Sequence, residues 1–325
     1  MVVSPKLVAR FRDDLAALWP NAEDGKGLLG LAVSGGGDSL GMLLLAAAAM
    51  PGRVRAATVD HGLRPESAAE AAFVAERCTE LGVQHDTLAV EVGDGNLQDR
   101  ARAARYTALS QWCANSELKA LATAHQLDDQ VETLLMRLNR GSGLSGLSAI
   151  RAVQSIQDNL PLIRPVLGWR REELAKVVRD AGWRAIDDPS NGDDRFDRVR
   201  LRKVLGSVDW LDRANLARSA ALLAEAEDSL EWAVEREVAE RVRFDGEQAS
   251  YAAGSSDAPA LIRVEVVRAL YRNFATSIDR RSAAEVVTRL TAEQVGNVAG
   301  LKFTVSGTAA ELQWVFRREP TRRTG

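Results

Sequence analysis

Short apolar runs alternate with helical patterns along the first 190 residues, and this alternation constrains the fold more than any other feature of the sequence. The apolar runs that we interpret as buried strands are residues 27–33, 53–60, 83–90 and 118–125. The stretches with helical character are residues 40–50, 66–81, 97–115 and 127–139. Strand and helix in repeated alternation predict an α/β fold, with a parallel, doubly wound sheet covered by helices on both faces. In such a sheet, ligands bind at the carboxyl ends of the strands.

The pattern changes after Arg140, and we expect further parts of the chain beyond the sheet. A long helical pattern covers about residues 208–244. Two shorter helices and a hairpin follow it, at residues 258–275, 281–291, 301–305 and 311–317. We therefore expect a first domain over residues 1–205, a long helical linker over 206–245 and a small α+β domain over 246–325.

The charge balance argues against a protein that binds nucleic acid through bulk positive charge. The 325 residues include 42 Lys and Arg against 45 Asp and Glu, a net charge of −3, which still leaves room for a local basic patch. The longest apolar run, residues 40–50, is about half of what a membrane span requires, and the N-terminus has no secretory h-region. We expect a cytoplasmic protein with no membrane partner. Cys78 and Cys113 are too few for a disulfide framework or a cysteine zinc site.

A glycine-rich loop follows the first predicted strand, at the edge of the sheet where ligands bind. It consists of Ser34, Gly35, Gly36, Gly37, Asp38 and Ser39. Small residues let backbone N–H groups approach phosphate oxygens at the start of a helix, and the Asp38 carboxylate can hold Mg²⁺ against those phosphates. The loop is not a Walker A motif, because no lysine occurs between Lys26 and Lys119, and Leu40 stands where GxGxxG requires glycine. The alternative interpretation is a tight turn that requires glycines.

Polar residues also follow the second and third predicted strands. Asp60 and His61 could contact a ligand amine, a metal or a phosphate, whereas the alternative is an Asx-turn beside a solvated histidine. Arg102 and Arg105 share one face of the next helix and could neutralise the charge of a leaving pyrophosphate. The alternative for this pair is a solvated helix face.

A group of acids surrounds the start of the fourth helix. His125, Asp128, Asp129 and Glu132 have i, i+3, i+4, i+7 spacing, which places them on one stripe if the helix begins early. Carboxylates gathered in this way fit either a metal site or the recognition of a cationic ligand. The alternative is the capping of a helix N-terminus by acids, which the helix dipole favours.

Basic residues gather in the polar stretch after the sheet. Arg195, Arg198 and Arg202 are candidates for contact with nucleic-acid phosphate, and the alternative is a salt-bridged surface helix. Arg140 and the loop at 141–146 could close over a substrate, or could be a helix C-cap followed by a turn.

These stretches resemble those of a known superfamily. SGGGDS is similar to the SGGxDS loop of the N-type ATP pyrophosphatases, which have the adenine nucleotide alpha-hydrolase-like fold and split ATP between its α and β phosphates. Within that superfamily, four further stretches resemble the tRNA(Ile)-lysidine synthetases: VDHGLRPES (59–67), NLQDRARAARY (96–106), TAHQLDDQVETLLMRLNRGSGLSGL (123–147) and DDPSNGDDRFDRVRLR (187–202). The resemblance covers about residues 25–205.

The resemblance implies a ligase that joins lysine to the wobble cytidine of the CAU-anticodon isoleucine tRNA, with ATP and Mg²⁺ as cofactors. It implies that free L-lysine and this tRNA are the partners, and that the C-terminal domain contacts the tRNA; a homodimer is left open. ATP would be bound by Ser34, Gly35, Gly36, Gly37, Asp38, Ser39, Asp60, His61 and Arg105. Lysine would be bound by His125, Asp128, Asp129 and Glu132. The tRNA would be bound by Arg64, Arg140, Arg195, Arg198 and Arg202. Catalysis would depend on Asp38, Asp129 and Arg102, with the Mg²⁺ ion on Asp38.

Two alternatives belong to other classes of function. A sulfur-transferring tRNA 2-thiolation enzyme usually shows paired cysteines, whereas Cys78 and Cys113 stand 35 residues apart and form no CxxC motif. A non-catalytic nucleotide-binding or RNA-binding module of the same fold could lose the acids at Asp38, Asp129 and Glu132, all of which are present.

Overall fold

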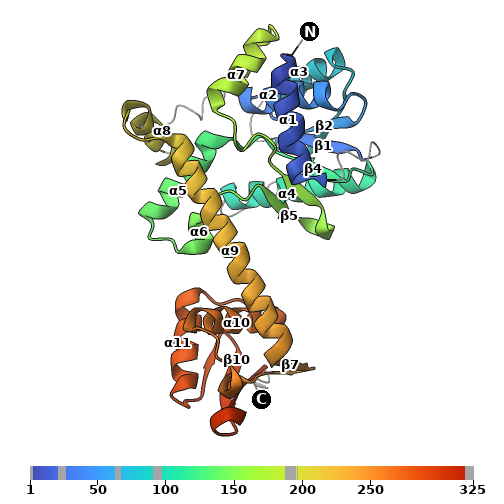
Figure 1. The fold of residues 1–325 in the computed structure, drawn as a ribbon. Helices are drawn as coiled ribbons and strands as arrows, with labels where there is room; N and C mark the ends of the chain where they lie inside the picture. The colour runs from blue at the N-terminus through green and yellow to red at the C-terminus, as the bar shows by residue number, and fades with distance from the viewer. Residues whose placement is uncertain are drawn as a thin grey trace. The chain divides into compact units, whose positions relative to one another are not determined.

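The computed structural model describes residues 3–20, 27–62, 67–90, 97–186, 195 and 197–318, and the chain divides into two compact units, residues 1–224 and 225–325. Figure 1 shows the helices and strands of both. Unit 1 contains α1 (Pro5–Leu18), β1 (Leu29–Ala32), α2 (Gly37–Ala49), β2 (Val54–Asp60), α3 (Ser67–Glu80), β3 (Gln84–Ala89), α4 (Leu97–Asn115), β4 (Ala120–Ala122), α5 (Leu127–Asn139), α6 (Leu144–Leu147), β5 (Val153–Ser155), the 3-10 helix η2 (Gln157–Asn159), β6 (Pro161–Ile163), α7 (Arg171–Asp180) and α8 (Asp197–Ser207).

The sheet of unit 1 confirms the predicted α/β class. Its strand order is β3-β2-β1-β4-β6-β5, and β1 pairs in parallel with both β2 and β4. The direction of winding therefore reverses at β1, and the loop after β1 opens at the point where such sheets bind ligands. The short edge strand β5 runs antiparallel to β6 and was not predicted, because its three residues are exposed and carry no apolar run.

The residues of β1 alternate between two apolar layers. Leu29 and Leu31 pack in the layer formed with α1, α2 and α7, while Ala32 packs in the layer formed with α4. A strand buried on both faces reads as a continuous apolar run, which explains why residues 27–33 show no polar alternation. Cys78 and Cys113 lie in these two different layers, and both are fully buried.

Unit 2 contains the antiparallel sheet. The helix α9 (Arg213–Arg241) includes the boundary between the units, and it is followed by β7 (Val242–Asp245), β8 (Gln248–Tyr251), η4 (Ala253–Ser255), α10 (Ala260–Asn273), α11 (Arg280–Thr291), β9 (Gly296–Val298), β10 (Leu301–Ser306), η5 (Ala309–Glu311) and β11 (Gln313–Arg318). The strand order is β7-β8-β11-β10-β9. β10 and β11 form the predicted hairpin, with Leu301 opposite Arg318 and Ser306 opposite Gln313.

The long helix differs from the predicted span of 208–244 at both ends. It begins at Arg213 because the Asp212 carboxylate accepts hydrogen bonds from the backbone N–H groups of Ala214 and Asn215, at 2.8 and 3.1 Å. It ends at Arg241 because the next residues pair with β8 as β7. Residues 213–224 belong to unit 1, where Leu216 and Ala220 pack against α5.

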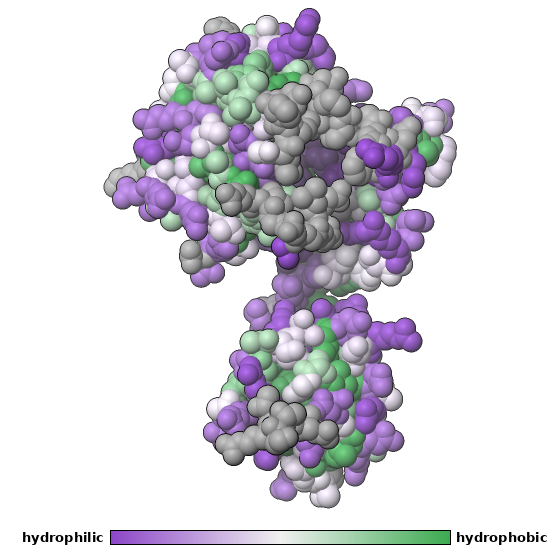
Figure 2. Space-filling model, turned by 180° about the vertical axis from the view of Figure 1, so that it is seen from behind, coloured by the Kyte–Doolittle hydropathy of each residue, from purple (hydrophilic) through white to green (hydrophobic). Residues whose placement is uncertain are grey.

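Each unit buries a core of apolar side chains. On the face that Figure 2 shows, hydrophilic residues cover much of the described surface, and hydrophobic residues are exposed in patches on both units. No helix in the described part of the chain is long and apolar enough to cross a membrane.

The close approach of α4 to β1 generates a first prediction. A Cβ atom added at Gly30 would lie 2.8 Å from Trp112 and 2.8 Å from Leu118, so these side chains would have to shift. We expect Gly30→Ala to lower the free energy of unfolding by about 1–3 kcal/mol, the usual effect of overpacking a core. Chemical denaturation measures the change. Gly168→Ala is the matched control, because an added Cβ there meets nothing within 4 Å; equal effects of the two substitutions would contradict the prediction.

Candidate active site

The loop between β1 and α2 has a backbone shape that requires glycine at one position. Gly35 has a φ of +83°, and a Cβ added there would lie 2.4 Å from the Ile186 side chain. The Ile186 N–H also donates to the Gly35 carbonyl, at 3.0 Å. The tight-turn interpretation is therefore correct for Gly35, and the turn leaves Ser34 exposed at the mouth of the loop.

Ser39 holds the loop closed from inside. Its hydroxyl accepts a hydrogen bond from the Ser34 N–H at 3.2 Å and donates to the Gly36 carbonyl at 3.0 Å. Gly36 is the N-cap of α2 and supplies no side-chain cap, so the first N–H groups of this helix lack the usual side-chain acceptor. A helix N-terminus whose first N–H groups lack an acceptor binds anions, and phosphate oxygens are good acceptors for these N–H groups.

Asp38 lies in the first turn of α2 and is the acidic residue of that turn. Its side chain is 29% exposed. Burial raises the pKa of Asp38 to about 6, although the nearby Arg171 guanidinium acts in the opposite direction. Mg²⁺ is commonly held by one or two carboxylates together with substrate phosphates. The described residues contain no cluster of three or more His, Cys, Asp or Glu side chains that could hold a metal ion.

Asp60 and His61 stand at the end of β2, at the same edge of the sheet. The Asp60 carboxylate accepts a hydrogen bond from the Gly62 N–H at 2.8 Å, which is the Asx-turn of the alternative interpretation, and this bond lowers the pKa of Asp60. The His61 Nδ1 atom is buried and has no hydrogen-bond partner among the described residues. Burial lowers the pKa of His61, which favours the neutral form of the ring.

Arginines gather around His125. Arg102 and Arg105 of α4 lie beside Tyr106, with their guanidinium carbons 5.2 and 6.0 Å from its ring centroid. Burial, and then the charges of Arg164, Arg105 and Arg102, lower the pKa of His125 to about 3. The histidine is therefore neutral among cations, and the positive potential of this region suits the phosphates of a ligand.

The helix α5 begins later than the predicted acidic stripe requires. It starts at Leu127, because the Gln126 side chain accepts from the Asp128 N–H at 2.5 Å and the Asp129 carboxylate accepts from the Gln126 N–H at 3.2 Å. His125 lies outside this helix, so the predicted stripe of four residues does not form. The Nδ1 atom of His125 instead lies 3.0 Å from the Thr123 hydroxyl. The capping interpretation is therefore correct for Asp129, which still keeps an oxygen for other contacts.

The α5 carboxylates are neutralised by arginines from elements later in the chain. Glu132 is only 1% exposed and accepts from Arg198 Nε at 2.6 Å and from Arg202 Nε at 2.9 Å. Arg198 also contacts Asp129, at 2.9 Å. Burial alone would raise the pKa of Glu132, but the hydrogen bonds from Arg202 and Arg198 hold it below its ordinary value. Burial raises the pKa of Asp129 despite the charge of Arg198.

Two further arginines complete the network. The Arg171 backbone N–H donates to Asp128 at 3.0 Å, and Arg213 donates to the other oxygen of the same carboxylate. The Arg171 guanidinium lies 3.4 Å from Asp129 and 3.5 Å from Glu132. Sequence patterns did not indicate Arg164, Arg171 or Arg213. The sequence signal that could have indicated these arginines was the cluster of α5 acids, since buried carboxylates require cationic partners.

The residues predicted to bind tRNA fall into different surroundings. Arg198 and Arg202 contact the α5 acids, as described above. Arg140 is the exposed C-cap of α5, about 12 Å along the helix axis from Glu132. It precedes α6, which forms where a Gly/Ser loop was expected. Arg195 is exposed, and Arg64 lies outside the described residues.

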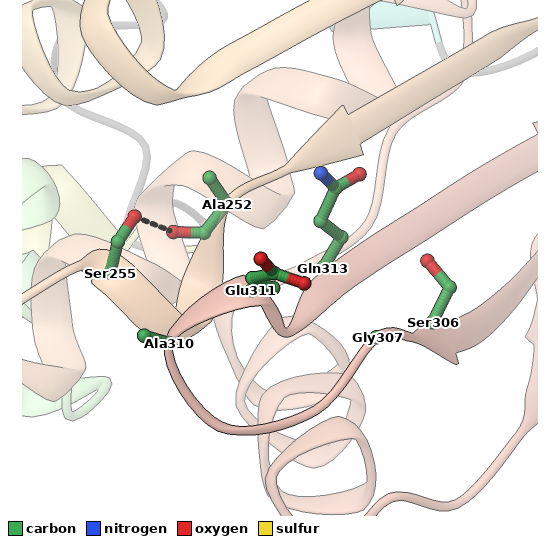
Figure 3. Close-up of a pocket in the computed structure, with 7 residues that line it drawn as sticks. All are labelled: Ala252, Ser255, Ser306, Gly307, Ala310, Glu311 and Gln313. Carbon is green, nitrogen blue, oxygen red and sulfur yellow. Dashed lines mark hydrogen bonds between the residues drawn. The ribbon is translucent and has the colours of Figure 1, made fainter.

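Unit 2 has a hollow of its own, of about 480 Å³, shown in Figure 3. It is lined by Ala252, Ser255, Ser306, Gly307, Ala310, Glu311 and Gln313. Glu311 is the charged member of this set, and the set contains none of the predicted site residues. The acids and bases predicted to act together are therefore in unit 1.

Comparisons with known proteins agree with this placement. The PP-loop domain family matches residues 8–208. The tRNA(Ile)-lysidine synthase of Novosphingobium aromaticivorans is 42% identical over 318 residues, which cover 97% of this chain and 94% of that protein. The tRNA(Ile)-lysidine synthase of Zymomonas mobilis is 42% identical over 228 residues, which cover 68% of each chain.

A solved structure shares the fold of the chain. The U34-tRNA thiolase NcsA from Methanococcus maripaludis, with its [4Fe-4S] cluster, has a TM-score of 0.54 and covers 67% of this chain and 79% of its own. Its sequence identity is 16%, so this likeness concerns the fold alone.

The pairing of Glu132 generates a second prediction. Glu132→Gln removes the charge that Arg198 and Arg202 share. We expect the free energy of unfolding to fall by roughly 3 kcal/mol, the lower end of the effect of breaking a buried ion pair, because the arginines are partly exposed. Urea denaturation of the two proteins measures this difference. Glu76→Gln, at an exposed ion pair with Arg77, is the control and should have an effect below about 1 kcal/mol; a Glu132→Gln effect as small as that would be inconsistent with the network.

Proposed function

Since the chain belongs to the tRNA(Ile)-lysidine synthase family, we propose that the carboxyl edge of its unit 1 sheet carries out both half-reactions of lysidine formation. The protein is an enzyme that uses ATP to form lysidine on tRNA(Ile). In the proposed reaction the wobble cytidine of a CAU anticodon is first adenylated, and free lysine then replaces AMP.

One observation carries the proposal. The loop carboxylate Asp38 and the α5 carboxylates Asp129 and Glu132 all lie within 4 Å of one guanidinium, that of Arg171. A nucleotide held by the loop and an amine held by the α5 acids would therefore adjoin. A two-step transfer requires that its two reactants, here the adenylated base and the lysine amine, are held next to each other.

The first half-reaction would use the loop and the arginines of α4. The free N–H groups at the start of α2, with Ser34 beside them, would bind the phosphates of ATP. The C2 oxygen of cytidine attacks the α-phosphorus, the bond to the bridging oxygen breaks, and pyrophosphate leaves. Arg102 and Arg105 would neutralise the charge that develops on this leaving group. Asp60 and His61, at the end of β2, are proposed to contact the same nucleotide.

Asp38 would hold the magnesium ion of the nucleotide. When bound, such an ion screens phosphate charge and polarises the phosphoryl group. Asp38 would have to be ionised for this role, and its raised pKa sets the pH above which that form predominates.

The second half-reaction would use the α5 acids. The ε-ammonium of lysine would be held by Asp129 and Glu132, with Asp128 and His125 close by. An ammonium cannot attack, so a proton must first pass to a carboxylate. Asp129 suits this role, because burial raises its pKa and makes it a better proton acceptor than an exposed aspartate. The free amine attacks C2, the bond to the adenylated oxygen breaks, and AMP leaves.

The tRNA would be bound outside this pocket. Its wobble base is an unstacked loop base and can reach a recessed site without melting a duplex. Arg64, Arg140, Arg195 and Arg198 are proposed to contact its phosphates, whereas Arg202 is proposed to stay paired with the buried Glu132. Unit 2 is proposed to bind the part of the tRNA outside the anticodon loop. The reaction is proposed to take place in the cytoplasm, where tRNA and ATP are found.

The buried cysteines argue against the thiolation alternative. Burial raises the pKa of both Cys78 and Cys113 to about 12, which suppresses the reactive thiolates. The two residues also lie in different apolar layers. Neither thiol is placed for persulfide or cluster chemistry at the edge of the sheet.

The proposal predicts that the protein transfers lysine to RNA. We expect labelled lysine to enter a CAU-anticodon isoleucine tRNA transcript only when ATP and Mg²⁺ are present, and pyrophosphate to be released in equal amount. Asp38→Asn should abolish incorporation, while Cys78→Ala should retain it. ATP turnover that needs neither the tRNA nor lysine would refute the proposed reaction.

The pKa of Asp38 predicts a pH dependence. Below pH 6 this carboxyl group becomes neutral and loses its hold on a cation, so kcat/KM for ATP should fall about tenfold per pH unit as the pH drops below 6. Carbon-13 NMR of the aspartate carboxyl groups should show one resonance that titrates near pH 6 and is missing from Asp38→Asn. The prediction would be contradicted by an activity that stays level to pH 5, or by a resonance that titrates near pH 4.

A further inference from the structure

Arg171 contacts acids of both proposed substrate sites, the nucleotide site at the glycine loop and the lysine site at α5. Its Nε atom lies 3.7 Å from Asp38, and its Nη2 atom lies 3.4 Å from Asp129 and 3.5 Å from Glu132. We propose that Arg171 makes the binding of lysine depend on the nucleotide, by neutralising the α5 acids until a nucleotide occupies the loop. This inference rests on the proposed function.

The main chain of Arg171 is held by hydrogen bonds and packing, whereas its side chain is partly exposed. Arg171 is the first residue of α7, and its backbone N–H is bound to Asp128. The helix is capped by the Glu173 carboxylate, which accepts from the Arg170 N–H at 2.8 Å. It packs tightly on α2, since a Cβ added at Gly41 would lie 3.1 Å from Leu174. The Arg171 side chain is 31% exposed, so its guanidinium can change partners while the helix stays in place.

The contacts of Arg171 are longer than those of the arginines beside it. Arg198 and Arg202 approach Glu132 to 2.6 and 2.9 Å, whereas the guanidinium contacts of Arg171 span 3.4–3.7 Å. Arg171 therefore contributes charge more than well-formed hydrogen bonds. When its guanidinium leaves, Glu132 keeps two cationic partners, and a buried charge is not left unpaired.

A bound nucleotide changes the electrostatic forces on the Arg171 guanidinium. The guanidinium is repelled by a cation held on Asp38 and attracted by the triphosphate at the loop, so it turns from the α5 acids toward the nucleotide. Asp129 then has less positive charge beside it and accepts the lysine ammonium more readily. Nucleotide and lysine should consequently bind with positive coupling, because each favours the same position of Arg171.

Calorimetry of lysine binding to the full chain tests this coupling. Lysine is titrated into the protein with and without saturating Mg²⁺ and α,β-methylene ATP, an analogue that cannot release pyrophosphate. We expect wild-type protein to bind lysine about tenfold more tightly with the analogue. In Arg171→Gln the ratio of the two affinities should fall to within about twofold of one, since affinity without the analogue rises. Arg179→Gln removes an exposed charge from the same helix and should keep the wild-type ratio.

Arg171→Lys supplies a second variant if the glutamine variant does not fold. Its shorter ammonium cannot span Asp38 and Asp129 together, so we expect a ratio between those of wild type and Arg171→Gln. A wild-type ratio near one, or an unchanged ratio in the Arg171 variants, overturns the coupling while lysine still enters the tRNA in the incorporation assay. Absence of lysine binding in every mixture, together with no incorporation, overturns both the coupling and the proposed function.

Discussion

The neutralisation of carboxylates at the carboxyl edge of the sheet organises the rest of unit 1. Glu132 is 1% exposed, and an ion in such surroundings loses several kcal/mol of solvation unless it is paired. The cationic partners of the α5 acids come from helices later in the chain. Arg171 begins α7, Arg198 and Arg202 lie on α8, and Arg213 begins α9. These ion pairs hold segments far apart in sequence against one helix, and they explain why residues 213–224 belong with the sheet.

The same network makes the site suited to exchange of cations. Acids and arginines are close to balanced there, so a lysine ammonium or a metal ion can enter by replacing a guanidinium instead of adding charge. Asp38 is the acid with the weakest partner, since its contact with Arg171 is 3.7 Å long and burial still raises its pKa to about 6. An incompletely neutralised carboxylate beside free helix N–H groups is where a magnesium nucleotide gains most from binding.

Local patterns predicted much of this arrangement, and long-range pairing explains what they missed. The glycine loop, the buried strands and the β10–β11 hairpin depend on neighbouring residues, so sequence periodicity and turn chemistry predicted them. The predicted start of α5 at residue 127 is confirmed. The stripe that includes His125 required an earlier start, and it does not form because the Gln126 side chain caps the helix through a hydrogen bond that glutamine rarely supplies. Arg171 and Arg213 carry no local signal, because their ion-pair partners are at least 39 residues away in the sequence.

Arg198 and Arg202 form ion pairs with the α5 acids, and this bears on how a chain with a net charge of −3 can bind RNA. Arg198 and Arg202, which were predicted to contact phosphate, are paired with the α5 acids, so these two arginines contribute little free positive charge to the surface. A phosphate that drew both arginines away would leave Glu132 without its two closest partners, which is unfavourable for a buried carboxylate. Arg198 is the more exposed of the two, at 40% against 34%, and it alone also contacts Asp129. Contact between Arg198 and an RNA phosphate would therefore reach the amine site directly, while Arg202 kept Glu132 paired.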